Sequence, residues 1–326
     1  MLIVPSHIPG RHCASSGMAD IVNHHGINWS EALCFGTGMG LGLWYLGFEG
    51  QGASRMVHVR SQDIEHQFFS RMGAGFAWEQ FPNPQDAHNA LISAISRGRP
   101  ALLRTDIYHL PYYSSSTHFP GHVIVAWGFD MERGIFRVSD THRPDLVEVP
   151  FQAMLKARYS KNPFFPMQGD QFAPASLCAP KNLPDIIARA IVDQSRQMLE
   201  PPVDFAGIKA LDRWMDEIGL WKDFDDWQWV CRFAYQVIEK RGTGGGGFRL
   251  MYADFLDEAA KMLPDILTLG LAWRMRELAD AWTTLALALK DASEKESPDF
   301  STVVPKLGAV RGLCLDYHQR AVRLAA

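Results

Sequence analysis

The chain has 326 residues, 47% of them hydrophobic and 21% charged, which is the composition of a folded globular protein long enough for two domains. The formal net charge of −4 excludes a strongly basic chain, so no nucleic-acid partner is expected. Five scattered cysteines without a Cys-x-x-Cys pair argue against a disulfide framework or a structural zinc site, and they favour a reducing cytoplasm.

The sequence also gives no reason to expect a membrane partner. Its start, Met1-Leu-Ile-Val-Pro5, lacks the basic region that is typical of a signal peptide. The most apolar later stretch, residues 264–289, carries four charged side chains near its middle, which argues against a transmembrane helix (Arg274, Arg276, Glu277 and Asp280).

The first predicted element is a helix that follows the turn Pro9-Gly-Arg-His-Cys13 and runs to about residue 24. Cys13 would open this helix, where the helix dipole and unpaired backbone N–H groups favour the reactive thiolate and stabilise an oxyanion on a bound acyl group. Most cysteines are small buried hydrophobic residues, so the local sequence alone does not decide between the two interpretations.

Three strands are predicted next, over residues 100–108, 122–128 and 135–139, with a turn at 129–134. A turn centred near residue 131 pairs positions whose numbers add to 262, and this places His122 opposite Asp140. An aspartate beside a histidine fixes the tautomer and favours imidazolium, which in turn stabilises a cysteine thiolate. We therefore predict a Cys13–His122–Asp140 site.

Two other histidines leave alternatives open. A shift of the turn by one residue places His142 opposite His122, so His142 is either a solvated loop residue, which we favour, or a second base. His118 and His122 also have a zinc-like spacing. No third ligand is evident nearby, and Pro120-Gly121 breaks any helix that would align the two rings, so no metal is expected.

Residues 163–184 contain five prolines and are predicted to connect two domains, an α+β domain over 1–162 and an all-α domain over 185–326. Helices are predicted from residue 185 nearly to the end, because apolar residues recur there with helical spacing. Their predicted ranges are 185–199, 207–218, 226–241, 248–262, 265–291 and 301–324.

Several motifs resemble the family of the butirosin-biosynthesis acyltransferases. In the first half these are Gly10-Arg-His-Cys13, Trp29-Ser-Glu-Ala-Leu-Cys-Phe-Gly36-Thr-Gly-Met-Gly40, Gly121-His122-Val-Ile-Val-Ala-Trp-Gly128 and Val138-Ser-Asp140. The second half contributes Gly242-Thr-Gly-Gly-Gly-Gly-Phe-Arg249 and the helix that follows it. The resemblance implies a papain-like catalytic domain followed by a helical domain of unassigned role.

The same resemblance implies acyl transfer in antibiotic biosynthesis. Cys13 would accept an acyl or aminoacyl group from an acyl carrier protein, whose phosphopantetheine holds it as a thioester, and pass it to a small-molecule amine. No cofactor of the chain's own is implied. Related papain-like enzymes place a glutamine six residues before the nucleophile as an oxyanion donor, and His7 stands there in this chain. Either His7 takes that role as an N–H donor or backbone groups near Cys13 suffice.

The glycine cluster has two interpretations. Residues 242–247 lack the Gly-Lys-Ser/Thr ending of a phosphate loop, so we favour a helix connection that needs positive φ. The alternative is a substrate-binding surface for the pantetheine arm or the acceptor, formed by Gly244, Gly245 and Arg249. An acidic carrier protein would need a local basic patch, for which the candidates are Arg232, Lys240, Arg241, Arg249, Arg274 and Arg276. Peptide or amide hydrolysis and a non-catalytic binding module remain alternatives, and an oligomer is compatible with the sequence.

Overall fold

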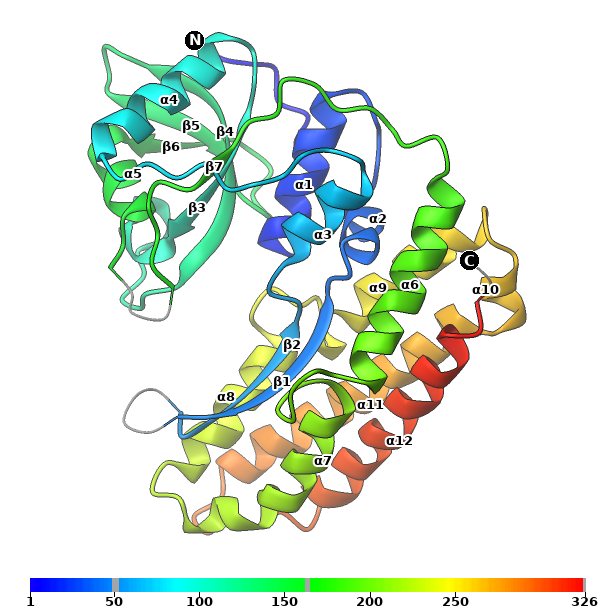
Figure 1. Ribbon diagram of the computed structural model, residues 1–326. Helices are drawn as coiled ribbons and strands as arrows, with labels where there is room; N and C mark the ends of the chain where they lie inside the picture. Colours follow the sequence, from blue (N-terminus) through cyan, green and yellow to red (C-terminus); the bar gives the residue numbers. More distant parts are fainter. Residues whose placement is uncertain (49–52, 162–164, 325–326) are drawn as a thin grey trace. The chain divides into compact units, whose positions relative to one another are not determined.

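The computed structural model describes residues 1–48, 53–161 and 165–324. These residues form two compact units, and neither unit is one continuous stretch of chain (Figure 1). Unit 1 comprises Met1–Cys34 and Phe68–Lys181, and unit 2 comprises Phe35–Gln67 and Asn182–Ala326. The chain therefore passes between the units inside two helices, α2 (Glu31–Thr37) and α3 (Ile64–Arg71), and once more after Lys181.

This division differs from the expected uninterrupted N-terminal domain. A hairpin of two antiparallel strands, β1 (Leu41–Gly47) and β2 (Arg55–Arg60), belongs to unit 2. The reason is burial of aromatic surface, because Tyr45 of β1 stacks on Trp214 and Trp221 of the helical part. The predicted boundary between residues 162 and 163 lies outside the described residues, as does Pro163 of the predicted connector.

Unit 1 is built on a five-stranded antiparallel sheet with the strand order β6-β5-β4-β3-β7. The three predicted strands are confirmed as β3 (Ala101–Asp106), β4 (Pro120–Asp130) and β5 (Ile135–Ser139). The edge strands β6 (Val147–Pro150) and β7 (Gln171–Phe172) were not predicted, since both are too short to show an alternating pattern.

The two faces of this sheet are covered by different helices (Figure 1). Leu103 and Ile124 lie in one hydrophobic core with residues of α4 (Pro84–Ser96) and α5 (Phe151–Arg158). The neighbouring Leu102 and Val123 face α1 (Cys13–His24) instead, as strand alternation requires. A Cβ at Gly17 of α1 would lie only 2.6 Å from the Leu102 side chain. This glycine therefore allows α1, which begins at Cys13, to pack closely on β3 and β4.

From residue 183 onward the described chain forms mainly helices, as predicted. The helices are α6 (Leu183–Leu199), α7 (Gly207–Glu217), α8 (Trp227–Glu239), α9 (Arg249–Ala260), α10 (Asp265–Thr268), α11 (Leu271–Ser293) and α12 (Val303–Ala321). The single helix predicted over 265–291 is wrong, because Gly270 has φ +65° and separates α10 from α11. Unit 2 as a whole is not all-α, because it contains the β1–β2 hairpin.

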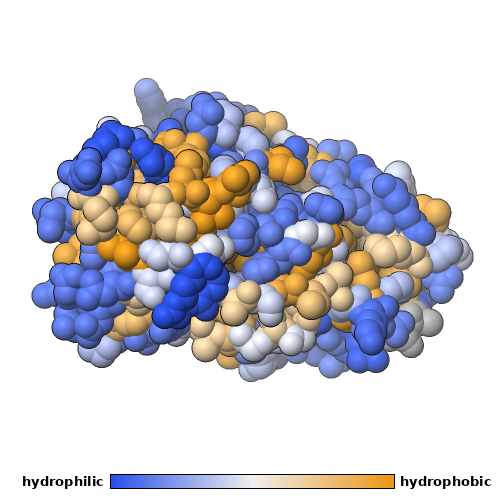
Figure 2. Space-filling view, turned by 90° about the horizontal axis from the view of Figure 1, so that it is seen from above, coloured by the Kyte–Doolittle hydropathy of each residue, from blue (hydrophilic) through white to orange (hydrophobic). Residues whose placement is uncertain are grey.

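Among the described residues, no helix is both long and apolar enough to cross a membrane. On the face shown in Figure 2, groups of hydrophobic residues are interspersed with hydrophilic ones.

Candidate functional site

Cys13 is the first residue of α1, as the sequence predicts. His12 caps the helix, with its Nδ1 atom accepting a hydrogen bond from the Ser15 backbone N–H at 3.3 Å. The thiol thus lies at the positive end of the helix dipole, beside backbone N–H groups of the first turn. Cys13 is partly exposed and Cys178 is exposed, whereas the other three cysteines are buried (Cys34, Cys231 and Cys314).

A partly buried carboxylate holds the turn that leads to Cys13. Glu31 accepts hydrogen bonds from the backbone N–H groups of Arg11 at 2.9 Å and His12 at 2.7 Å, and from the Ser15 hydroxyl at 3.0 Å. Burial raises the pKa of Glu31, although these hydrogen bonds oppose the shift. A side chain at Gly10 would meet the Glu31 carboxylate at 2.9 Å. Sequence analysis did not assign this role to Glu31.

The structure brings the three predicted catalytic residues together. His122 Nε2 lies 2.9 Å from Oδ1 and 3.0 Å from Oδ2 of Asp140. The His122 ring also forms a hydrogen bond with the Cys13 side chain. Because Asp140 engages Nε2, Nδ1 is the ring nitrogen left for the thiol. This order of thiol, imidazole and carboxylate is the arrangement in which a base activates a nucleophile and a third group orients the base.

The register that we predicted for this contact is wrong, although the contact forms. Val125 pairs with Ser139, so paired numbers add to 264, and a bulge between Ala126 and Gly128 shifts them to 265 nearer the turn. His122 and Asp140 are therefore not directly opposite each other. Asp140 follows the last residue of β5, Ser139, and precedes Thr141, whose φ is +48°. From this position just beyond the end of the strand, its carboxylate reaches the His122 ring.

The charges of this pair are set by burial and by mutual attraction. Burial of His122 acts most strongly and lowers its pKa, but the attraction and hydrogen bond of Asp140, together with Cys13, outweigh it and raise the pKa to about 10. Burial likewise acts to raise the pKa of Asp140, but the positive charge and the hydrogen bond of His122 hold it below the usual value. The geometry thus favours an imidazolium beside an ionised carboxylate at neutral pH.

Two consecutive tyrosines contact this pair. Both lie in the short helix η2 (Pro111–Tyr113), and Tyr112 donates a hydrogen bond of 2.6 Å to Oδ2 of Asp140. The Tyr113 hydroxyl lies 3.3 Å from His122 Nε2. Thr141 donates a further hydrogen bond of 2.9 Å to Asp140. Burial and the charge of Asp140 raise the pKa of Tyr112, which keeps its hydroxyl protonated and able to donate. These contacts fix the carboxylate that orients the histidine.

The Tyr112→Phe variant is expected to lose about ten- to a hundredfold in the rate of the reaction that depends on Cys13. Phenylalanine keeps the packing but removes one hydrogen bond to a charged acceptor, which is worth roughly 1.5–3 kcal/mol. Tyr113→Phe is the matched control, because its contact of 3.3 Å is longer and it should cost less. Steady-state rates of the two purified variants check this order, and a greater loss for Tyr113→Phe would contradict it.

His7 does not aim a ring nitrogen toward Cys13. Its Nδ1 lies 2.8 Å from Oδ2 of Asp20, and its Nε2 donates to the Arg143 carbonyl oxygen at 2.9 Å. Asp20 lies in α1 and also accepts a hydrogen bond of 2.6 Å from Ser139, the last residue of β5. With both nitrogens engaged, His7 is a poor oxyanion donor. The geometry instead makes His7 and Asp20 a buried bridge from the nucleophile helix to the strand that precedes Asp140.

The Asp20→Asn variant is expected to lower the free energy of unfolding by about 2–4 kcal/mol at pH 5.5, because it leaves the buried His7 ring without the carboxylate that it pairs with. Burial raises the pKa of Asp20, although the hydrogen bonds from His7 and Ser139 oppose the shift. For His7, burial lowers the pKa most, but hydrogen bonding and attraction to Asp20 outweigh it, so the pKa is raised. A raised pKa stabilises the fold fully below the unfolded value of about 6.5 and loses that effect as the pH rises through the folded value.

The difference in stability between wild type and Asp20→Asn should therefore narrow between pH 5.5 and pH 9. Denaturant unfolding at both pH values measures it, and taking the difference cancels the titration of groups that the substitution does not affect. If the difference in stability between the two proteins widened as the pH rose, the pairing of a protonated His7 with Asp20 would be contradicted.

The other two histidines lie away from the His122 ring. His142 is exposed in the turn after β5, as the favoured interpretation expects. His118 does not pair with His122, because its Nδ1 lies 2.7 Å from Oδ2 of Asp106 while His122 contacts Asp140. The zinc-like spacing of these two histidines therefore does not correspond to a shared site.

In unit 2 the glycine cluster connects α8 to α9. Gly244 and Gly245 have φ values of +69° and +94°, which favours the interpretation as a helix connection that needs positive φ. Arg249 is only 1% exposed; its guanidinium donates a hydrogen bond of 2.6 Å to the Gly247 carbonyl oxygen and lies on the ring of Trp282. A docking surface that uses Arg249 is therefore not supported, because burial removes the side chain from a partner's reach.

Three other arginines of the expected basic patch have acidic partners. Arg232 lies 3.0 Å from Glu294, Arg274 lies 2.6 Å from Asp316, and Arg276 pairs with Asp257. Such pairs largely neutralise the positive charge that would attract an acidic carrier protein.

Three residues around the site were not predicted from the sequence: Asp20, Glu31 and Tyr112. Asp20 follows Cys13 by seven residues, which is two helical turns, so helical spacing alone places both on one side of α1. Nothing in the local sequence distinguishes Tyr112 from a core aromatic residue.

The fold and the site define an α+β protein with a helix-borne cysteine that contacts a histidine–aspartate pair. Residues 12–141 match the model of the butirosin biosynthesis protein H N-terminal domain, and this part of the chain belongs to that family. A second model, a domain of unknown function (DUF4872), matches residues 152–320. No curated protein matches the chain.

Proposed function

We propose that this protein is a cysteine-dependent acyltransferase that moves an acyl or aminoacyl group from a carrier-protein thioester to an amine. One observation carries the proposal: Cys13 opens α1 and forms a hydrogen bond with His122, which in turn contacts Asp140. A thiol suits a thioester donor, because exchange between two thioesters is nearly balanced in energy.

The reaction proceeds in two halves. The Cys13 thiolate attacks the donor carbonyl carbon, and N–H groups of the first turn of α1 stabilise the oxyanion. When the intermediate collapses, the bond to the carrier sulfur breaks and the departing thiolate takes a proton from the His122 imidazolium. An amine then attacks the acyl-Cys13 thioester, its proton passes to His122, and Cys13 leaves as a thiolate. At the end Cys13 is again a thiolate and His122 is again an imidazolium.

The matched family supports a role in specialised metabolism, since the family is named for butirosin biosynthesis. The proposed donor is an acyl carrier protein whose phosphopantetheine holds the acyl group, and the proposed acceptor is a small-molecule amine. The proposed setting is the cytoplasm, where carrier proteins and thiols remain reduced.

The test uses the full chain and a panel of acyl and aminoacyl N-acetylcysteamine thioesters as minimal donors. Intact-protein mass spectrometry should show one acyl group on Cys13 in the absence of amine. Addition of a panel of small amines should discharge the enzyme with formation of an amide. Release of free acid alone with every amine would favour a hydrolase, and failure of every thioester to acylate Cys13 would overturn covalent catalysis and favour a binding module.

A further inference from the structure

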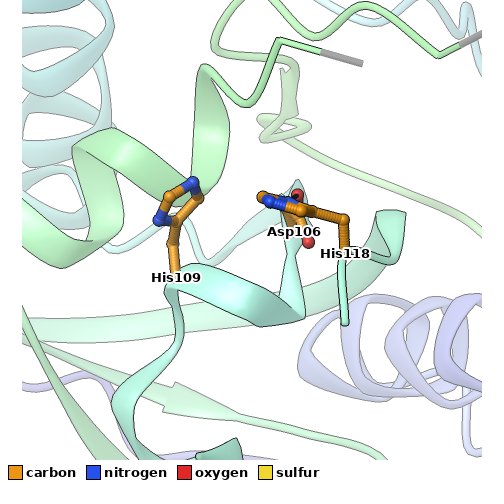
Figure 3. Close-up of side chains that lie close together, drawn as sticks. All are labelled: Asp106, His109 and His118. Atoms are coloured by element: carbon orange, nitrogen blue, oxygen red, sulfur yellow. Dashed lines mark hydrogen bonds and ion pairs between the residues drawn. The ribbon is translucent and has the colours of Figure 1, made fainter. Parts of the chain in front are cut away.

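A second cluster of polar side chains lies at the two ends of the segment that joins β3 to β4. Asp106 ends β3, His109 ends the short helix η1 (Ile107–His109), and His118 precedes β4. One carboxylate oxygen and one ring nitrogen from each histidine all lie within 4.8 Å of one another. Figure 3 shows the three side chains close together, with Asp106 next to His118 and His109 facing them from the other side.

The carboxylate of this cluster is held rigidly by the protein. Asp106 is fully buried, and its Oδ1 accepts hydrogen bonds from the backbone N–H groups of Tyr108 at 3.1 Å and Phe119 at 2.9 Å. Its Oδ2 accepts from the Ser160 hydroxyl at 2.5 Å and lies 2.7 Å from His118 Nδ1. Hydrogen bonds of this kind orient a carboxylate ligand in metal sites.

The two histidine rings are positioned through one tyrosine. The His118 ring stacks on Tyr108 with 4.0 Å between ring centroids, and His109 meets the same tyrosine edge-on at 5.0 Å. The centroids of the two histidine rings are 5.8 Å apart. Both imidazoles are therefore held near the Asp106 carboxylate without belonging to the Cys13 site.

We infer that Asp106, His109 and His118 form a binding site for one divalent transition-metal ion of the zinc type. Two imidazole nitrogens and one carboxylate oxygen are the donor set that such ions prefer, whereas calcium and magnesium take mainly oxygen ligands. Metal–ligand bonds of about 2.0–2.2 Å need donor atoms closer together than the 4.8 Å limit within which these three lie. Small rotations of the histidine rings complete the site.

The ion takes the place of the proton on His118 Nδ1. In the metal-free pair, this proton forms the hydrogen bond between His118 Nδ1 and Asp106 Oδ2. When the ion binds, a neutral His118 ring carries its single proton on Nε2 instead, whereas a doubly protonated ring releases the Nδ1 proton to solvent and keeps the one on Nε2. In both cases the Nδ1 lone pair binds the metal, and the metal bonds take the place of the hydrogen bond. Water molecules fill the remaining coordination positions, and no redox change is involved.

Binding would join the two ends of the segment 106–118. This segment includes Tyr112 and Tyr113, whose hydroxyls contact Asp140 and His122. A metal that closes this loop reduces its conformational freedom and so keeps the tyrosines in place. The ion thus acts as a clamp on a supporting loop. This inference is independent of the proposed acyl transfer.

The test measures Co²⁺ and Zn²⁺ binding by the metal-stripped full chain, without a histidine tag. A Cys13→Ala, Cys178→Ala background removes the two solvent-accessible thiols as competing ligands. We expect one Co²⁺ per chain, with absorption bands in the visible range, and displacement of Co²⁺ by one equivalent of Zn²⁺. We also expect Zn²⁺ to raise the melting temperature.

His109→Ala and His118→Ala should each weaken binding at least tenfold and remove the rise in melting temperature. His142→Ala is the matched control, because His142 is an exposed histidine outside the cluster, and it should bind the metal as the parent does. Circular dichroism verifies the fold of each variant. Absence of stoichiometric binding by the parent, or equal binding by all three histidine variants, would overturn the site.

Discussion

Replacement of Cys13 by alanine is expected to abolish acyl-enzyme formation and to lower turnover by at least about 10⁴-fold, as loss of the nucleophile does in enzymes with a comparable triad. The reason is chemical, because alanine removes the sulfur that His122 contacts and leaves no group able to take the acyl chain. The fold should persist, since the hydrogen bonds of Glu31 that hold the preceding turn go to other residues.

Cys178→Ala is the matched control, because Cys178 is an exposed cysteine that is not part of the Cys13–His122–Asp140 site. It should keep wild-type turnover within about twofold, as surface changes usually do. Labelling with iodoacetamide followed by peptide mapping adds a second measurement. In wild type, Cys13 should react faster than Cys178 at pH 6, because an imidazolium partner favours the thiolate. If the Cys13→Ala protein kept the wild-type rate, covalent catalysis by Cys13 would be contradicted.

The second large effect is expected for Asp140→Asn, which should lower turnover about 10²-fold. Asparagine keeps the shape of the side chain but removes the charge that helps raise the pKa of His122. His122 would then lose its proton at a lower pH than in wild type, so the imidazolium form becomes scarce first on the alkaline side. The rate of iodoacetamide labelling at Cys13, measured against pH, should therefore change at a lower pH in Asp140→Asn than in wild type.

His142→Ala is the control for this variant, since His142 also follows β5 but is exposed. It should change turnover by less than about twofold. Rates measured from pH 5.5 to pH 9 separate the two variants. If His142→Ala caused the larger loss, the assignment of the orienting residue to Asp140 would be wrong.

The sequence supports the core of the candidate site better than its surroundings. The glycine turn that precedes Cys13 is a local signal, and it predicts that Cys13 opens a helix. The structure adds that His12 caps this helix, which the sequence did not indicate. The contact of His122 with Asp140 was also predicted, but by a register that does not occur. Asp130 pairs with Ile135, so the turn between the strands lies further along the chain than predicted and the paired numbers begin at 265. The bulge between Ala126 and Gly128 brings the sum back only to 264, and neither feature has a clear signature in the sequence.

Contacts between distant residues were beyond prediction. Asp20 bridges His7 and Ser139, and Glu31 binds backbone N–H groups of another segment. The sequence around a carboxylate does not indicate which distant residues the fold will bring near it. The helices of unit 2 were predictable because their apolar spacing is regular. The hairpin was not, since glycines interrupt the alternation of Leu41-Gly-Leu-Trp-Tyr-Leu-Gly47.

The interrupted course of the chain has a consequence for biosynthesis. Residues 35–67 leave the ribosome early, but the other part of their compact unit begins only at Asn182. During translation the β1–β2 hairpin must therefore wait, with Tyr45 lacking Trp214 and Trp221, until much of the remaining chain has emerged. A fragment cut at the end of the N-terminal family match would keep this unpaired aromatic surface. Such a fragment should aggregate, and separate expression of unit 1 would require a short linker in place of residues 35–67.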